Sequence, residues 1–198
     1  MDACVAGHSS AHGARRIGAG MKTITWIDVE TTGLSAQRNS LLEIACLVTD
    51  GDLNVLDESG YQAVVHHTYG QAQTAFAEAN GYVQHMHAKT GLWGRLTSGT
   101  ALSLIDTQLH RYVRQFSEAK TSPVGGNSVR LDMNFMDANL PLVAGHLDYH
   151  MIDVSTVSNL ASIWYGEPWF EKASDHTAMT DIRESIKELK HYRKAAFK

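Results

Sequence analysis

The sequence has few of the features that mark secreted or membrane proteins. Of its 198 residues only two are cysteine and three are proline. Cys4 and Cys46 share no metal-ligand spacing, and such sparse cysteine is typical of a reduced, intracellular protein. No apolar run approaches the roughly 18 residues that a membrane-spanning helix needs. We therefore expect a soluble protein without disulfides and without a membrane partner.

Excess positive charge is also missing. The formal net charge is -4, whereas proteins that bind long nucleic acid by displacing counterions usually carry a basic surface. A nucleic-acid substrate would therefore be short, or held by metal ions. Apolar residues make up 43% and charged residues 19%, which is ordinary for a globular chain. We expect residues 21–198 to form a single domain.

The first twenty residues are rich in Gly, Ala, Ser and His and have no apolar periodicity, so we expect residues 1–20 to be a disordered tail. Arg15 and Arg16 among small residues also resemble an organellar transit peptide, whereas Asp2 does not fit that pattern. The expected location is the cytoplasm, or the mitochondrion if the tail is a transit peptide.

The remaining pattern predicts an α/β fold with a mixed sheet of five strands flanked by helices. The first three strands should form an antiparallel meander, with a turn at 51–52. Predicted strands cover 23–29, 41–50, part of 53–67, 123–126 and 150–154. Predicted helices cover 72–88, 100–119, about 129–139, 156–165 and 176–195, with Ser128 capping the third and Ser155 the fourth.

Asp28 and Glu30 are the most informative local feature. They follow the apolar segment TITWI, and side chains two apart on a strand point to the same face. Crowded carboxylates at a buried strand end repel one another unless a cation lies between them, and Mg²⁺ and Mn²⁺ prefer carboxylate oxygen. The alternative interpretation is a solvated strand end.

Three further residues are candidates for the same site. Asp132 falls in the first turn of a predicted helix, where the helix dipole alone would favour it. Asp181 lies beside the apolar stripe of the last helix, and solvent exposure is the simpler interpretation. His176 precedes Asp181 by five residues, which on a helix would place them roughly 140° apart. His176 should therefore precede the helix proper, where an imidazole with its pKa near 6.5 can act as a base.

In order, Asp28, Glu30, Asp132, His176 and Asp181 resemble the DEDDh exonucleases. The blocks WIDVETTGL, LLEIACLVTD, GNSVRLDMNF, IDVST and HTAMTDIRESIKELKHYR resemble those of oligoribonucleases. The resemblance implies a ribonuclease-H-like fold in which the four acids hold two divalent cations, Mg²⁺ or Mn²⁺, and His176 is the general base. It also implies 3′→5′ hydrolysis of short RNA to nucleoside 5′-monophosphates.

The resemblance further implies a set of substrate contacts and a homodimer. Leu34 resembles a leucine wedge against the bases, although a turn residue packed in the core is the alternative. Ser128 resembles a serine that caps the substrate 5′ phosphate, and the neighbouring subunit is expected to complete the cap. The implied substrate-binding residues are Leu34, His87, Ser128, Tyr149, His150 and Ser155.

The chain departs from the family pattern at three positions. His150 replaces the usual arginine and is a weaker phosphate partner, Thr90 replaces a serine, and Thr180 replaces an aspartate. Two other functions are kept open. One is a DEDDh exonuclease acting on longer RNA or DNA ends, and the other is a non-catalytic nucleotide-binding protein with the same fold.

Overall fold

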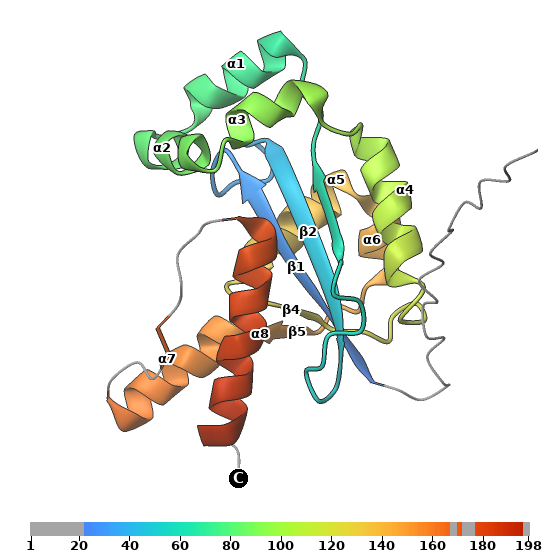
Figure 1. Ribbon diagram of the computed structural model, residues 1–198, viewed down its shortest axis with the longest axis vertical. Coiled ribbons are helices and arrows are strands. Elements are labelled where there is room, and N and C mark those ends of the chain that lie inside the picture. The colour runs from blue at the N-terminus through green and yellow to red at the C-terminus, as the bar shows by residue number, and fades with distance from the viewer. Residues whose placement is uncertain (1–21, 167–169, 172–176, 196–198) are drawn as a thin grey trace, which may run out of the picture.

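The computed structural model describes residues 22–166, 170–171 and 177–195. At its centre is a five-stranded sheet in the order β3-β2-β1-β4-β5 (Figure 1). β1 to β3 form the predicted antiparallel meander, and β4 and β5 continue the sheet in parallel with β1. The predicted mixed sheet of five strands is thus confirmed. The strands are β1 Thr23–Thr31, β2 Leu41–Asp50, β3 Tyr61–Val64, β4 Val124–Gly126 and β5 Met151–Asp153.

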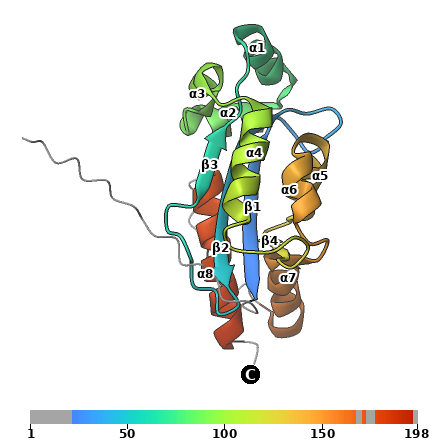
Figure 2. The ribbon, with the colours of Figure 1, turned by 90° about the vertical axis from the view of Figure 1, so that its right-hand side faces the viewer.

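Helices cover both faces of this sheet (Figures 1 and 2). One face carries α4 (Leu102–Val113), α5 (Arg130–Asn139) and α6 (Pro141–His146), and the other carries α8 (Ala178–Ala195). The end of the sheet where β1 finishes is covered by α1 (Tyr69–Glu78), α2 (Gly81–Lys89), α3 (Leu92–Arg95) and the 3-10 turn η1 (Leu96–Ser98). α7 (Val154–Tyr165) follows β5 directly.

Alternation along β1 decides which layer each of its side chains joins. Ile27 and Val29 belong to the core shared with α4, α5 and α6. Ile24 and Trp26 belong to the core beneath α8, whose Ile182 and Ile186 pack there as the predicted apolar stripe requires. Because alternate side chains of a strand share a face, Asp28 and Glu30 lie on the same face of β1 as Ile24 and Trp26, toward α8. The strand is therefore apolar at its start and acidic at its end on the same face.

The predicted helix over 72–88 is wrong, because two helices occupy that region. Ala79 is extended, with ψ 139°, and the side chain of Asn80 accepts a hydrogen bond from the backbone N–H of Val83 at 3.0 Å. Asn80 thereby starts a new helix. The helix predicted over 100–119 also ends early, at Val113, before the turns that lead to β4.

Both predicted serine caps are wrong. α5 begins at Arg130 without a side-chain cap, and Ser128 has a positive φ of 52°. α7 begins before Ser155, and its cap is Asp153, whose carboxylate accepts the backbone N–H of Ser155 at 2.9 Å. A carboxylate at this position is favourable for the same reason as a serine, because it satisfies N–H groups that the helix leaves unpaired.

The short helix α6, which starts at Pro141, is not among the predicted helices, although proline favours the first turn of a helix. Asp106 on α4 accepts the N–H groups of Leu142 and Val143 at 3.0 Å each and so fixes α6 against α4. Among the described residues no helix is long and apolar enough to cross a membrane. The predicted tail, 1–20, and His176 lie outside the described residues.

Candidate metal centre

Three carboxylates meet at the end of β1. Asp28 and Glu30 come from β1, and Asp181 comes from the first turn of α8, which packs against that strand (Figure 1). One oxygen from each lies within 4.8 Å of the others. Such a set of oxygen ligands suits a divalent cation that retains part of its water. The structure therefore brings together three of the four acids expected from the sequence as candidate ligands.

Asp132 reaches the same strand from the opposite layer. It lies in the first turn of α5, is buried, and its Oδ1 accepts the backbone N–H of Val29 at 2.9 Å, between the two β1 acids. Burial raises the pKa of Asp132, the bond from Val29 lowers it in part, and Asp153 raises it. Asp132 therefore lies next to the three-acid cluster, and its negative charge is one of the causes that raise the pKa of Glu30.

Glu30 is the most perturbed acid of the cluster. Burial, followed by Asp181, Glu43 and Asp132, raises the pKa of Glu30 from 4.5 to about 8. Without a cation its carboxyl is thus largely protonated at neutral pH. A divalent cation favours the ionised form and reverses this effect. The donor set and its repulsion both fit a metal site.

His87 does not supply the missing positive charge. Its Nε2 lies 3.0 Å from the carbonyl oxygen of Thr31, so this nitrogen donates, and Nδ1 lies 3.7 Å from Glu30 Oε2. Burial lowers the pKa of His87, an effect that the Thr31 bond and Glu43 only partly oppose. The neutral ring therefore presents an unprotonated Nδ1 toward Glu30. With no exposed surface, His87 lies behind Glu30, and in this conformation a substrate cannot touch it directly.

A charged pair lies behind Glu30 and was not predicted from the sequence. Glu43 is opposite Glu30 in the β1–β2 register, is buried, and is paired with Arg95 at 2.9 Å. Gln62 donates to the same carboxylate oxygen at 3.1 Å. An acid inside the apolar strand LLEIACLV is the signal that could have identified Glu43.

Leu34 lies in the turn after β1 with 81% of its surface exposed. The alternative that it packs in the core as a turn residue is therefore wrong. It is exposed beyond the acidic end of β1, where an apolar side chain could meet a base.

Ser128 and Ser155 meet within one chain. Their hydroxyl oxygens lie 3.3 Å apart, and the N–H of Ser128 donates to Asp153 Oδ1 at 3.0 Å and to Ser155 Oγ at 3.1 Å. The side chain of Asn127 accepts from Ser155 Oγ at 2.9 Å. Ser155 thus lies beside Ser128 of its own chain, and the expected contribution of a neighbouring subunit to the cap stays a prediction.

Tyr149 and His150 lie away from these serines, just before the edge strand β5. Tyr149 is 80% exposed, and its ring centroid is 4.0 Å from that of His150. The Nδ1 atom of His150 lies 2.6 Å from Asp148 Oδ1. His150 is thus already engaged with a carboxylate, which weakens it as a phosphate ligand.

Known proteins resemble this chain in both sequence and fold. An Exonuclease family model matches residues 25–189. The oligoribonuclease of Streptomyces coelicolor is 39% identical over 178 residues, covering 88% of this chain and 86% of its own. The human protein named mitochondrial oligoribonuclease is 36% identical over 203 residues, covering 97% and 84%.

Solved structures of exonucleases also resemble this chain in fold. Exonuclease I from Methylocaldum szegediense has a TM-score of 0.64 at 18% identity, over 88% of this chain and 41% of its own. E. coli exonuclease I in complex with an oligonucleotide also has a TM-score of 0.64, at 15% identity, over 88% and 41%. The chain spans about two fifths of these longer proteins. The fold, with carboxylates at the end of its central strand, is that of the ribonuclease-H-like exonucleases. The chain belongs to the Exonuclease family and, within it, to the oligoribonucleases.

Proposed function

We propose that this protein is a metal-dependent 3′→5′ exoribonuclease that degrades short oligoribonucleotides to nucleoside 5′-monophosphates. The carboxylate cluster of Asp28, Glu30 and Asp181, in a chain related to oligoribonucleases over most of its length, is the observation that supports this function best. We further propose that residues 21–198 act as a single catalytic domain.

Asp28, Glu30, Asp132 and Asp181 are the proposed ligands of two divalent cations, Mg²⁺ or Mn²⁺. When bound, such a pair lowers the pKa of an attacking water and stabilises the leaving 3′ oxygen. The protein's own contribution begins with Glu30, which loses its proton as a cation binds. Asp132 stays fixed to β1 through Val29, which holds one ligand rigidly against the strand. His176 is the proposed base that takes the proton of the water, by its resemblance to the family histidine.

Substrate length would be limited by contacts on either side of this centre. Leu34, exposed beyond β1, is proposed to pack against the bases. The hydroxyl of Ser128 and, once it turns away from Asn127, that of Ser155 are proposed to donate to the 5′ phosphate. Tyr149, His150 and His87 are proposed to contact substrate more weakly or through other residues. Because these contacts recognise phosphate and base faces rather than base edges, we expect little sequence preference.

A homodimer is proposed through α7 and the edge strand β5. Ile163, Trp164 and Tyr165 expose 75%, 66% and 57% of their surface, close together in sequence at the end of α7. Met151 on β5 exposes a further 44%. Large exposed apolar side chains and an unpaired edge strand are both features of interaction sites. The expected occupant is a second copy of the same surface.

The compartment is a proposal that depends on the tail. The human and cattle relatives are named mitochondrial. We propose an intracellular enzyme whose tail, with Arg15 and Arg16, selects between cytoplasm and mitochondrion. Imaging of the full chain against a chain that begins at Met21 would test this, and equal distributions would contradict a targeting role.

The function is tested by comparing hydrolysis of a 5′-phosphorylated dinucleotide with that of a twenty-nucleotide RNA, both 5′-labelled, with Mn²⁺. We expect faster turnover of the dinucleotide, and products of a longer RNA that shorten one nucleotide at a time from the 3′ end. A preference for the twenty-mer would favour an exonuclease of longer strands. Absence of turnover on both would favour a non-catalytic binding protein.

A further inference from the structure

The pairing of β1 with β2 is irregular at the metal centre. Glu30 is paired with Glu43 across the two strands. The next residue, Thr31, is paired with Leu41, so Leu42 of β2 has no partner on β1. An extra residue of this kind bends a strand and re-aims the side chains beside it, and such bulges are common next to active sites. The bulge therefore lies beside a proposed metal ligand, at the point where its carboxylate joins the cluster.

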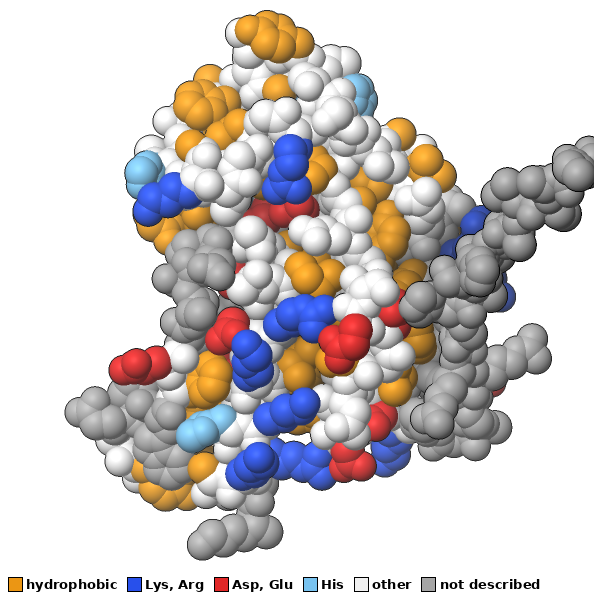
Figure 3. Space-filling model, viewed as in Figure 1, with side chains coloured by type: hydrophobic (Ala, Val, Ile, Leu, Met, Phe, Trp, Pro, Cys, Tyr) orange, Lys and Arg blue, Asp and Glu red, His pale blue; other side chains and the backbone are white. Residues whose placement is uncertain are grey.

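The helices at the end of the sheet contact β2 at this bulge. The unpartnered Leu42 is fully buried, in an apolar cluster with Leu92 of α3 and Leu96 of η1. The adjacent Glu43 is paired with Arg95 of α3 at 2.9 Å. Figure 3 shows Lys and Arg side chains gathered over α8, lower on that face, and few at the α1–α3 end. An apolar contact and an ion pair from α3 thus fix the β2 side of the bulge.

His87 of α2 contacts the β1 side of the same bulge. The residue is fully buried, and its Nε2 donates to the carbonyl oxygen of Thr31 at 3.0 Å. Trp93 of α3 packs edge-on against the ring, with centroids 5.5 Å apart, and restricts its orientation. Within the described residues Nδ1 makes no hydrogen bond, so the bond to Thr31 alone sets which nitrogen carries the proton. The ring is thus directed at the backbone that follows Glu30.

We propose that His87 is a positioning residue that fixes the bulge at Thr31 and thereby aims the carboxylate of Glu30 into the metal centre. Nδ1 lies 3.7 Å from Glu30 Oε2, too far for a hydrogen bond, so His87 acts through the backbone of the next residue. Loss of a group that orients a metal ligand lowers metal affinity by about 10–100-fold. The inference rests on the proposed function, because that function makes Glu30 a metal ligand.

Three substitutions at position 87 separate the hydrogen bond from the bulk of the ring. His87→Gln places an amide N–H where Nε2 lies, so this variant keeps a donor for Thr31. His87→Leu fills a similar volume without a donor. The amide of His87→Asn is too short to reach Thr31, so this variant makes the same comparison with His87→Gln should His87→Leu not fold.

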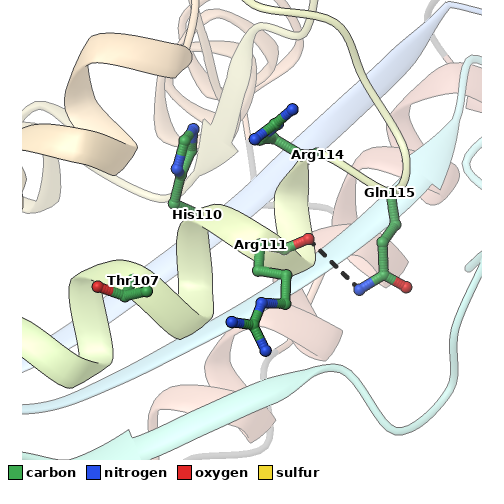
Figure 4. Close-up of a pocket in the computed structure, with 5 residues that line it drawn as sticks. All are labelled: Thr107, His110, Arg111, Arg114 and Gln115. Carbon is green, nitrogen blue, oxygen red and sulfur yellow. Dashed lines mark hydrogen bonds between the residues drawn. The ribbon is translucent and has the colours of Figure 1, made fainter.

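His146→Leu is the matched control outside the metal centre. His146 on α6 is also buried, and its Nε2 lies 3.2 Å from the carbonyl oxygen of Ser117. It packs against His110, which Figure 4 shows on α4, with ring centroids 5.2 Å apart. These helices cover the face of the sheet opposite α8, which carries Asp181. The control therefore removes a buried histidine and its backbone bond without touching the bulge.

Two measurements test the role, neither of which needs RNA. The first is hydrogen exchange in EDTA at the amide of Thr32, which donates to Ser40 at 3.0 Å just beyond the bulge. We expect faster exchange in His87→Leu and His87→Asn only. The second is calorimetric Mn²⁺ affinity at one fixed pH. We expect it to fall by about tenfold or more in the same two variants, and to stay near the wild-type value in His87→Gln and His146→Leu.

Equal Mn²⁺ affinity in all variants, or equal losses in His87→Gln and His87→Leu, would overturn the positioning role. A loss in His146→Leu as large as that in His87→Leu would also overturn it, because reduced stability alone would then explain the effect. A wild-type chain that binds no Mn²⁺ would instead refute the proposed metal centre, and the exchange rates in EDTA would still decide whether His87 fixes the bulge. Absence of exoribonuclease activity would be a separate result.

Discussion

The pH dependence of stability without metal follows from the acids at the end of β1. The pKa of Glu30 is raised from 4.5 to about 8 in the folded chain, chiefly by burial. Across that interval the folded chain binds more protons than the unfolded chain, so the free energy of unfolding falls as pH rises. Each such carboxyl changes it by about 1.4 kcal/mol per pH unit, so Glu30 accounts for at most on the order of 5 kcal/mol over the whole interval and about 4 kcal/mol between pH 5 and pH 8.

The assay is urea unfolding in EDTA between pH 5 and pH 8, for the wild type, Glu30→Gln and the exposed control Glu78→Gln. We expect the wild type and the control to lose several kcal/mol over this range. Glu30→Gln should lose less, because the amide is neutral throughout and the raised pKa of Asp132 is left as the remaining contribution from this cluster. Added Mn²⁺ should stabilise the wild type more at pH 8 than at pH 5, because binding requires ionised carboxylates. A flat wild-type profile, or the same slope in Glu30→Gln, would refute this reasoning.

Four further substitutions have definite expected outcomes. Arg95→Met leaves buried Glu43 without its partner and should cost roughly 2–3 kcal/mol in urea unfolding. Gly60→Ala should cost about 1–2 kcal/mol in the same assay, because φ is +62° and an added Cβ would lie 2.8 Å from a backbone oxygen. Trp164→Glu should shift the proposed dimer toward monomer in light scattering. Ser155→Ala should reduce the kinetic preference for a 5′-phosphorylated over an unphosphorylated dinucleotide severalfold.

Each of these substitutions has a matched control. Arg183→Met breaks an ion pair with an exposed acid and should cost under about 1 kcal/mol. A Cβ at Gly94 would meet nothing within 4 Å, so Gly94→Ala should not destabilise. Tyr69→Glu alters an exposed aromatic far from α7 in sequence, and Ser103→Ala alters an exposed serine on α4. Equal effects in any variant and its control would contradict the corresponding explanation.

Local pattern predicted the sheet better than the helix boundaries. The apolar strands and the two-residue spacing of Asp28 and Glu30 required only alternation, which β1 follows. The break at Asn80 was missed because the run of helix-compatible residues on both sides hid an N-cap. Asp153 took the cap assigned to Ser155, since either side chain can satisfy the same N–H groups.

The convergence of distant acids lay beyond what local pattern could predict. Nothing in the periodicity of their helices links Asp132 or Asp181 to β1, and the expectation that they meet came from resemblance to a family. The ion pair of Glu43 and Arg95 behind the cluster was not predicted at all. Glu43 lies in a strand whose neighbouring residues are apolar, and its partner Arg95 lies 52 residues away. Such pairs become visible only when tertiary contacts are known.

The most direct test of the metal-dependent mechanism combines Mn²⁺ titration with hydrolysis of a 5′-phosphorylated dinucleotide, for the wild type, Asp181→Asn and Asp137→Asn. Asp137 is an exposed acid on α5, so its variant loses the same charge outside the cluster. We predict that Asp137→Asn binds Mn²⁺ and turns over like the wild type, whereas Asp181→Asn stays folded and loses both properties. Wild-type turnover in Asp181→Asn would contradict the account.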